Sequence, residues 1–240
     1  MGDVTSIVAP APVPPDSDIA TAARTLARPR AIIFDWDNTL VDTWPCIGRA
    51  TNITLETMGL PTWTDSEIRA RVAGSLRDTF PRIYGARWEE AREVYYRAFK
   101  TVHLEMLAAL PGAEALLNTA AQAGLYMGVV SNKVGGYLRS EAAHLGWDRY
   151  FGRLVGAEDA VRDKPAPDPI WLALSDSAIP AGPQVWFVGD TAVDVDCGRA
   201  AGCTTILVHR ETTDPIPHYR TADCETLAQL IGAALANPTS

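Results

Sequence analysis

The decisive stretch of this 240-residue chain is Ala31-Ile32-Ile33-Phe34-Asp35-Trp36-Asp37-Asn38-Thr39. Its first four residues are apolar and include adjacent β-branched residues, which is typical of a short buried strand. Acidic residues follow at once, so the strand is expected to deliver carboxylates at its carboxyl end. Because residues two apart on an extended chain point the same way, Asp35 and Asp37 can face one small site.

Two carboxylates held close together repel each other unless a cation or a shared proton relieves the repulsion. On its own, the Asp35/Asp37 pair also fits a strand end followed by an Asx turn. A second predicted strand, 125–130, ends at Ser131-Asn132-Lys133. There a hydroxyl and backbone N–H groups at the start of a helix would make an anion seat, although a simple helix N-cap gives the same pattern.

Further charged residues follow the same logic. Asp190 comes directly after the apolar strand 185–188 and can complete an oxygen-ligand site for Mg²⁺. Asp194 lies four residues later near a helix N-terminus, where helix capping is the alternative explanation. Lys164 sits in a loop stiffened by prolines at 165, 167 and 169, so it can hold one cation against carboxylates and a phosphate. A solvated surface lysine is the alternative.

Apolar strands alternate with helical patterns over most of the chain. This alternation predicts an α/β fold with a doubly wound, Rossmann-like parallel sheet and helices on both faces. In such a sheet the ligand crevice lies outside the carboxyl ends of the strands, so Asp35, Asp37, Ser131 and Asp190 should converge there. The expected strands are 31–34, 125–130, 153–156, 185–188 and 204–208. The expected helices are 113–123, 135–145, 168–178, one after 190 and one from about 225.

The chain also divides by pattern. Residues 1–28 open with several prolines and are expected to form a disordered leader. Residues 43–110 show helical periodicity, with segments at 44–59, 65–73 and 88–108 and no convincing strand, so we expect an all-helical cap domain inserted after the first strand. The α/β catalytic core would then comprise 29–42 and 111–240.

Composition excludes several classes of protein. There are 21 basic and 29 acidic residues, and a net charge of −8 argues against a nucleic-acid partner, which would need clustered Lys and Arg. No apolar stretch is long enough for a membrane span. The four cysteines are scattered and lack C-x-x-C spacing, which favours reduced thiols and a cytoplasmic protein. We therefore expect a small-molecule partner and a monomer or homodimer.

The ordered motifs resemble those of the haloacid dehalogenase-like hydrolase superfamily over about residues 30 to 235. Asp35 to Leu40 is similar to its first motif, Ser131 to its second, Lys164 to its third, and Gly189-Asp190 through Asp194 to its fourth. The resemblance implies that Asp35 is the nucleophile, forming an aspartyl-phosphate, and that Asp37 is the general acid and then the general base. It further implies that Ser131 and Lys164 hold the phosphoryl group. Mg²⁺ would be bound by Asp35, the backbone carbonyl of Asp37 and Asp190, with Asp194 assisting the metal or positioning Lys164.

The resemblance also narrows the class. An Asp at position 37 favours a phosphatase, because the dehalogenases of the superfamily lack it, and a helical insertion after the first motif resembles the helical-cap (C1) subfamily. Within that subfamily, the motif Ser131-Asn132-Lys133 is most similar to the second motif of phosphoglycolate phosphatases. This resemblance makes Asn132 a further candidate for substrate binding. Asn38 replaces the more usual Gly, a mild departure because Asn tolerates left-handed backbone.

Substrate choice is expected to lie in the cap. Arg77, in the Gly-containing bend 72–77, could pair with a substrate carboxylate, although Arg69, Arg71, Arg82 and Arg87 are equally plausible as solvated helix charges. A phosphomutase similar to β-phosphoglucomutase is an alternative function, since it would use the same aspartates. A phosphoaspartate receiver module is an alternative of a different class. The helical insertion argues against a receiver, and so does Asp37, which favours hydrolysis of the aspartyl-phosphate. A dinucleotide-binding protein is weaker still, because no G-x-G-x-x-G follows a strand.

Overall fold

The chain divides into a core unit and a helical unit. The computed structural model describes residues 17–72, 76–209 and 214–237. The core unit takes the described residues up to Val41 and from Ala109 onward, and the helical unit is Asp42–Ala108. The chain passes between them at two short strands that pair with each other, β2 (Val41–Asp42) and β3 (Ala108–Ala109).

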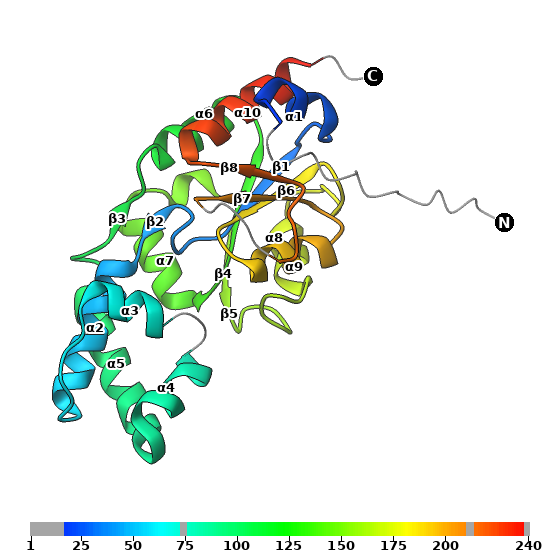
Figure 1. Cartoon of the computed structure of the whole chain (residues 1–240). Helices are drawn as coiled ribbons and strands as arrows, with labels where there is room; N and C mark the ends of the chain where they lie inside the picture. Colours follow the sequence, from blue (N-terminus) through cyan, green and yellow to red (C-terminus); the bar gives the residue numbers. More distant parts are fainter. Residues whose placement is uncertain (1–16, 73–75, 210–213, 238–240) are drawn as a thin grey trace. The chain divides into compact units, whose positions relative to one another are not determined.

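A six-stranded sheet forms the centre of the core unit (Figure 1). Its strand order is β5-β4-β1-β6-β7-β8, and every neighbouring pair is parallel, which confirms the predicted α/β fold. The strands are β1 (Ala31–Phe34), β4 (Tyr126–Val134), β5 (Arg153–Ala157), β6 (Val185–Gly189), β7 (Thr204–Val208) and β8 (Tyr219–Thr221).

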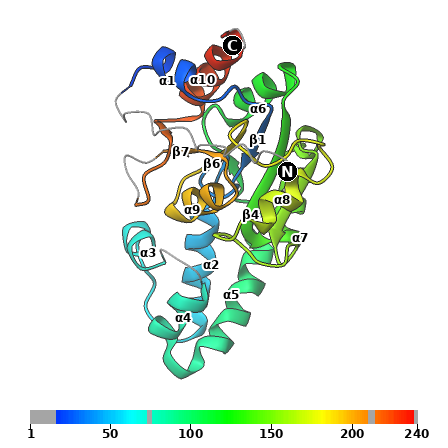
Figure 2. The ribbon, with the colours of Figure 1, turned by 90° about the vertical axis from the view of Figure 1, so that its right-hand side faces the viewer.

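Helices cover both faces of this sheet (Figures 1 and 2). On one face, Ile33 of β1 and Phe187 of β6 share a buried cluster with Ile170 of α8 and Cys197 of α9. The crossover helices α6 and α7 lie on the opposite face, as right-handed connections require. The helices of the core unit are α1 (Ile19–Thr25), α6 (Ala113–Gln122), α7 (Gly135–His144), α8 (Asp168–Leu174), α9 (Ala192–Ala200) and α10 (Cys224–Ala236), with the 3₁₀ turn η2 (Asp148–Tyr150).

Strand register explains how distant residues reach one edge. Phe34, the last residue of β1, lies opposite Val129 of β4 and Val188 of β6. Because the three strands are parallel, the residues that come next along each of them emerge at the same edge of the sheet. Asp35, Ser131 and Asp190 are therefore brought to this edge by backbone pairing alone.

The beginning of the described chain differs from the expectation of a leader to residue 28. Residues 1–16 lie outside the described part, but Ile19–Thr25 forms helix α1. Asp18 caps it by accepting a hydrogen bond from Thr21 N at 2.7 Å, and Ala22 and Ala23 are buried as α1 packs beside α10 (Figure 2). Prolines end before this segment, so nothing prevents an alanine-rich helix there.

The helical unit contains α2 (Trp44–Thr57), α3 (Asp65–Arg71), α4 (Leu76–Tyr84), the 3₁₀ turn η1 (Gly85–Arg87) and α5 (Trp88–Val102). Helix α4 is not among the predicted segments because it carries Pro81 in its interior, where proline normally weakens a helix. Aromatic rings hold α4 to α5: the Phe80 ring lies 5.5 Å from that of Tyr95, in an edge contact. Among the described residues, no helix combines the length and apolar character needed to cross a membrane.

Strand β8, absent from the prediction, is attached to β7 through His218. The His218 backbone N–H donates to Thr205 O at 3.0 Å, and its ring Nδ1 accepts from Thr205 N at 3.0 Å. Burial, together with the charge of Arg199, lowers the pKa of His218 below its ordinary value. The imidazole is thus held neutral, with Nδ1 as a hydrogen-bond acceptor.

Acid should weaken this attachment. Because the pKa of His218 is lower in the folded chain than in the unfolded chain, its contribution is complete above about pH 6.5 and is lost as the pH falls below that value. We therefore expect the free energy of unfolding to fall between pH 7 and pH 5, because a protonated ring can no longer accept the hydrogen bond from Thr205 N. Urea titrations at pH 7 and pH 5 should show a smaller decrease for His218→Asn, whose amide oxygen accepts without protonation. An identical decrease in both proteins would contradict this expectation.

Candidate active site

Three buried aspartates form an acidic group at the carboxyl edge of the sheet. Asp35 follows β1, Asp190 follows β6, and Asp194 lies in the first turn of α9. One carboxylate oxygen from each lies within 4.8 Å of the other two. Residues far apart in the sequence are thus brought together at the edge where the parallel fold places a ligand crevice.

Lys164 lies inside this acidic group. Its Nζ is 2.6 Å from Asp35 Oδ1 and 2.8 Å from Asp194 Oδ1, and its side chain is buried. The alternative of a solvated surface lysine is therefore wrong. The sequence holds three lysines. Lys164 is buried at this edge and the Lys133 side chain is 7% exposed, whereas Lys100 is exposed on α5.

Asn132 fixes the loop that carries Lys164. Its amide donates through Nδ2 to Lys164 O at 3.1 Å and accepts through Oδ1 from Lys164 N at 3.1 Å. This two-point contact ties the end of β4 to the lysine loop. Asn132, predicted as a substrate contact, has its side chain engaged in holding the backbone of Lys164.

Asp194 serves two contacts at once. Its Oδ2 accepts hydrogen bonds from Thr191 N at 3.0 Å and Thr191 Oγ1 at 2.6 Å, which closes a capping box at the start of α9. Its other oxygen, Oδ1, pairs with Lys164. Helix capping, which the sequence offers as the alternative explanation of Asp194, is thus present, and the same side chain also contacts Lys164.

The charges in this group are unbalanced. Burial raises the pKa of Asp35 to about 8; Lys164 opposes the rise, and the carboxylates of Asp194 and Asp190 add to it. Burial also opposes protonation of Lys164, but Asp194 and Asp35 together raise its pKa above the ordinary value, so it stays a fixed cation. Three buried carboxylates around one lysine therefore favour the binding of a further cation.

The donor set fits magnesium. Carboxylate oxygens are the ligands that Mg²⁺ prefers, and a divalent ion would offset the negative charge that Lys164 leaves uncompensated. One carboxylate oxygen from each aspartate lies within 4.8 Å of the other two, so the three side chains could converge on one ion. The acidic group could therefore hold a metal ion.

Asp37 belongs to a neighbouring network. Its Oδ1 lies 2.6 Å from Lys133 Nζ, and Lys133 Nζ also lies 2.6 Å from Glu141 Oε2 on α7. Glu141 in turn accepts a hydrogen bond from Trp36 Nε1 at 2.7 Å. Although burial opposes it, Asp37 and Glu141 raise the pKa of Lys133 above its ordinary value.

Ser131 and Asn38 complete the description of this edge. Ser131 is buried within β4, and its Oγ accepts a hydrogen bond from Lys133 N at 3.1 Å. The predicted anion seat at a helix start is misplaced, because β4 continues to Val134 and α7 begins only at Gly135. Asn38 has a φ of 59°, the left-handed conformation for which Asn is suited.

Arg77 is the remaining predicted site residue. Its backbone lies in the first turn of α4, and its side chain is outside the described part of the structure. The bend 73–75 before it also lies outside the described residues.

Sequence reasoning missed Glu141 and the side-chain role of Trp36. Glu141 lies eight residues after Lys133 and reads as an ordinary polar residue of a helix. The one signal in the sequence was the spacing of Leu138, three residues before Glu141, which puts an apolar residue on the same face of the helix.

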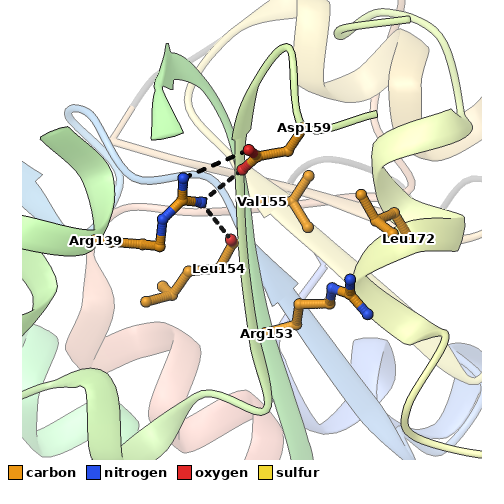
Figure 3. Close-up of a pocket in the computed structure, with 6 residues that line it drawn as sticks. All are labelled: Arg139, Arg153, Leu154, Val155, Asp159 and Leu172. Carbon is orange, nitrogen blue, oxygen red and sulfur yellow. Dashed lines mark hydrogen bonds and ion pairs between the residues drawn. The ribbon is translucent and has the colours of Figure 1, made fainter. Parts of the chain in front are cut away.

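A separate hollow lies beside the edge strand β5 (Figure 3). Its two arginines are already paired: Arg139 with Asp159 at 2.7 Å, and Arg153 with Asp176 at 2.8 Å. None of the predicted site residues lines it. The hollow is thus distinct from the acidic group.

Comparison with known proteins agrees with this geometry. A family model described as haloacid dehalogenase-like hydrolase matches residues 32–208. A phosphoglycolate phosphatase of Yersinia pestis is 28% identical, covering 74% of this chain and 79% of its own length. An N-acetylmuramic acid 6-phosphate phosphatase of Pseudomonas aeruginosa is 32% identical over 75% of this chain and 82% of its own. The crystal structure of a hydrolase of the same superfamily from Ehrlichia chaffeensis is 29% identical, with a TM-score of 0.63, covering 87% of this chain and 98% of that one.

Proposed function

We infer that this chain, which belongs to the haloacid dehalogenase-like hydrolase family and is a phosphatase, hydrolyses a small phosphate monoester through Asp35. The observation that carries the proposal is the position of Asp35 Oδ1, buried 2.6 Å from Lys164 Nζ within the acidic group. A carboxylate attacks a phosphate dianion only where nearby positive charge offsets their repulsion.

The proposed reaction has two steps. In the first, Asp35 forms a bond to phosphorus while the bond from phosphorus to the leaving oxygen breaks, and Asp37 gives that oxygen a proton. In the second, Asp37 takes a proton from water as the water oxygen attacks phosphorus, which releases phosphate and restores the Asp35 carboxylate. The proton lost by Asp37 in the first step is thus regained in the second.

Other side chains would hold the transferring group. The Ser131 hydroxyl and Lys164 Nζ would contact phosphoryl oxygens, and Asn132 and Asp194, which both contact Lys164, would keep it in position. Asp35, Asp190 and the backbone carbonyl of Asp37 would hold Mg²⁺, with Asp194 beside them, and the ion when bound supplies positive charge where charge develops.

The substrate class follows from the relatives. The names of two relatives denote phosphate esters of carboxylic acids, so we propose a phosphoglycolate-like ester that carries a carboxylate. Arg77 is the candidate partner for that carboxylate. The cytoplasmic location and the monomeric or homodimeric state expected from the sequence stay predictions.

Phosphate release from a panel of small esters tests the proposal. With Mg²⁺ present, we expect release that EDTA abolishes and that Asp35→Asn lowers by at least about 1,000-fold, because the attacking oxygen is lost. Asp148→Asn, which changes an exposed aspartate in the same way, should keep full activity. Release that persists in Asp35→Asn would contradict the assignment of the nucleophile, and no release from any ester would contradict the function.

A further inference from the structure

Two lysines at the site have different partners. Lys164 contacts the nucleophile candidate Asp35, whereas Lys133 contacts Asp37. The Lys133 side chain is 7% exposed, so its charge is not in free contact with solvent. Its ammonium group lies between two carboxylates, at 2.6 Å from each.

Glu141 holds Lys133 from the other side. The Glu141 side chain is 1% exposed, and its Oε2 accepts hydrogen bonds from both Lys133 Nζ and Trp36 Nε1. Trp36 is itself fixed, because its buried ring makes edge contacts with the rings of Trp147 at 5.9 Å and Phe151 at 6.4 Å. Glu141 is therefore anchored to the packed interior.

The contacts form a closed ring. Trp36 precedes Asp37 in the chain, its indole holds Glu141, Glu141 holds Lys133, and Lys133 returns to the Asp37 carboxylate. The Asp37 side chain, at 28% exposed, is the member most open to solvent. A ring of this kind limits the orientations open to Asp37, the residue that must reach the leaving oxygen.

Stability alone does not explain such a ring. Burying a lysine and a glutamate costs desolvation energy that their attraction barely recovers, so a well-packed apolar pair would stabilise the fold as well or better. What an apolar pair cannot do is direct a carboxylate that must move a proton, a task that depends on geometry.

We propose that Lys133 and Glu141 are positioning residues that hold the Asp37 carboxylate in the orientation from which it protonates the leaving group. This inference rests on the proposed function and adds to it a role for residues outside the acidic group. It predicts that the dependence of the rate on Lys133 follows the need of the leaving group for a proton.

Two esters separate this role from a structural one. Nitrophenolate leaves p-nitrophenyl phosphate without needing a proton, whereas the alkoxide of an alkyl phosphate such as phosphoglycolate needs one. We expect Lys133→Met to lower kcat for the best alkyl phosphate at least about tenfold, with KM within about threefold. The rate of the initial nitrophenolate burst, which reports phosphorylation of Asp35, should stay within about threefold of wild type. Lys133→Arg should recover part of the lost kcat, and Lys100→Met is the matched control without effect.

A second variant guards against misfolding. Lys133→Met leaves Glu141 buried without its ion-pair partner, which could destabilise the fold. The double variant Lys133→Met/Glu141→Gln removes both charges, and the Gln side-chain oxygen can still accept the hydrogen bond from Trp36 Nε1. It should show the same split between the two esters. In an Asp37→Asn background, Lys133→Met should lower the residual kcat by less than about twofold, because residues that act as a unit are not additive.

The outcomes are distinct. An equal loss in the kcat for the alkyl phosphate and in the rate of the nitrophenolate burst would overturn the positioning role while leaving the phosphatase intact. A change confined to KM, or a full further loss in the Asp37→Asn background, would overturn it as well. A wild-type protein with neither burst nor release would overturn the proposed function itself.

Discussion

Replacing Lys164 with methionine is expected to lower kcat/KM by about 100- to 1,000-fold, because it removes the fixed cation beside the attacking carboxylate. The same change leaves Asp35 and Asp194 buried without the ammonium group that both contact. Breaking a buried ion pair on one side typically costs about 3 to 5 kcal/mol, so the free energy of unfolding should fall by an amount of that order.

Magnesium distinguishes the two effects of Lys164→Met. Because a divalent ion would supply charge to the same three aspartates, adding Mg²⁺ should raise Tm more in Lys164→Met than in wild type, while activity stays low. Lys100→Met provides the control, since Lys100 is exposed on α5. Full activity in Lys164→Met would contradict the role of Lys164 beside the attacking carboxylate. A Tm that changes neither on substitution nor on addition of Mg²⁺ would contradict its ion pairs with Asp35 and Asp194.

Gly189→Ala should have the second large effect, through crowding. A Cβ added at Gly189 would lie 2.4 Å from both Cβ and Cγ of Asp194, far inside contact distance. Asp194 cannot yield freely, because Lys164 and Thr191 hold its two oxygens. We expect a loss of about 1 to 3 kcal/mol in the free energy of unfolding, as for other overpacked sites. Activity should fall at least about tenfold, because the displaced carboxylate releases Lys164.

Gly182→Ala is the matched control for this crowding. No atom lies within 4 Å of a Cβ added at Gly182, and its backbone is not in the left-handed region. Chemical denaturation and phosphate release measured on both variants would separate crowding from a general effect of alanine. A Gly189→Ala protein as stable and active as Gly182→Ala would show that Asp194 tolerates displacement.

Much of the core unit could be predicted because its strands are apolar runs that stop abruptly. β1, β6 and β7 are bounded by polar or small residues, so composition alone marks them. β8 is three residues long and depends on His218 contacts with β7, which no local pattern reveals. Helix α4 was hidden by Pro81, whose low helix propensity is overridden by tertiary packing. Helix α1 was hidden by the proline-rich stretch before it, although its own alanine-rich residues favour a helix.

The candidate site could be predicted where chemistry follows a strand. Asp35 and Asp190 were found because parallel strands end at one edge, and Lys164 because its loop carries motif-like prolines. The partner of Asp37 could not be found that way, because Lys133 and Glu141 meet only when α7 packs against the sheet. The engagement of Asn132 with the Lys164 backbone likewise depends on tertiary structure.

The distribution of lysines has a practical consequence for labelling. All three lysines of the chain fall within the described residues, and Lys100 is the one whose side chain is exposed. Among lysine side chains, amine-reactive dyes should therefore attach at Lys100, within the helical unit and outside the acidic group. Dye bound to lysine in the wild-type protein is therefore expected on that unit, without first removing competing lysines.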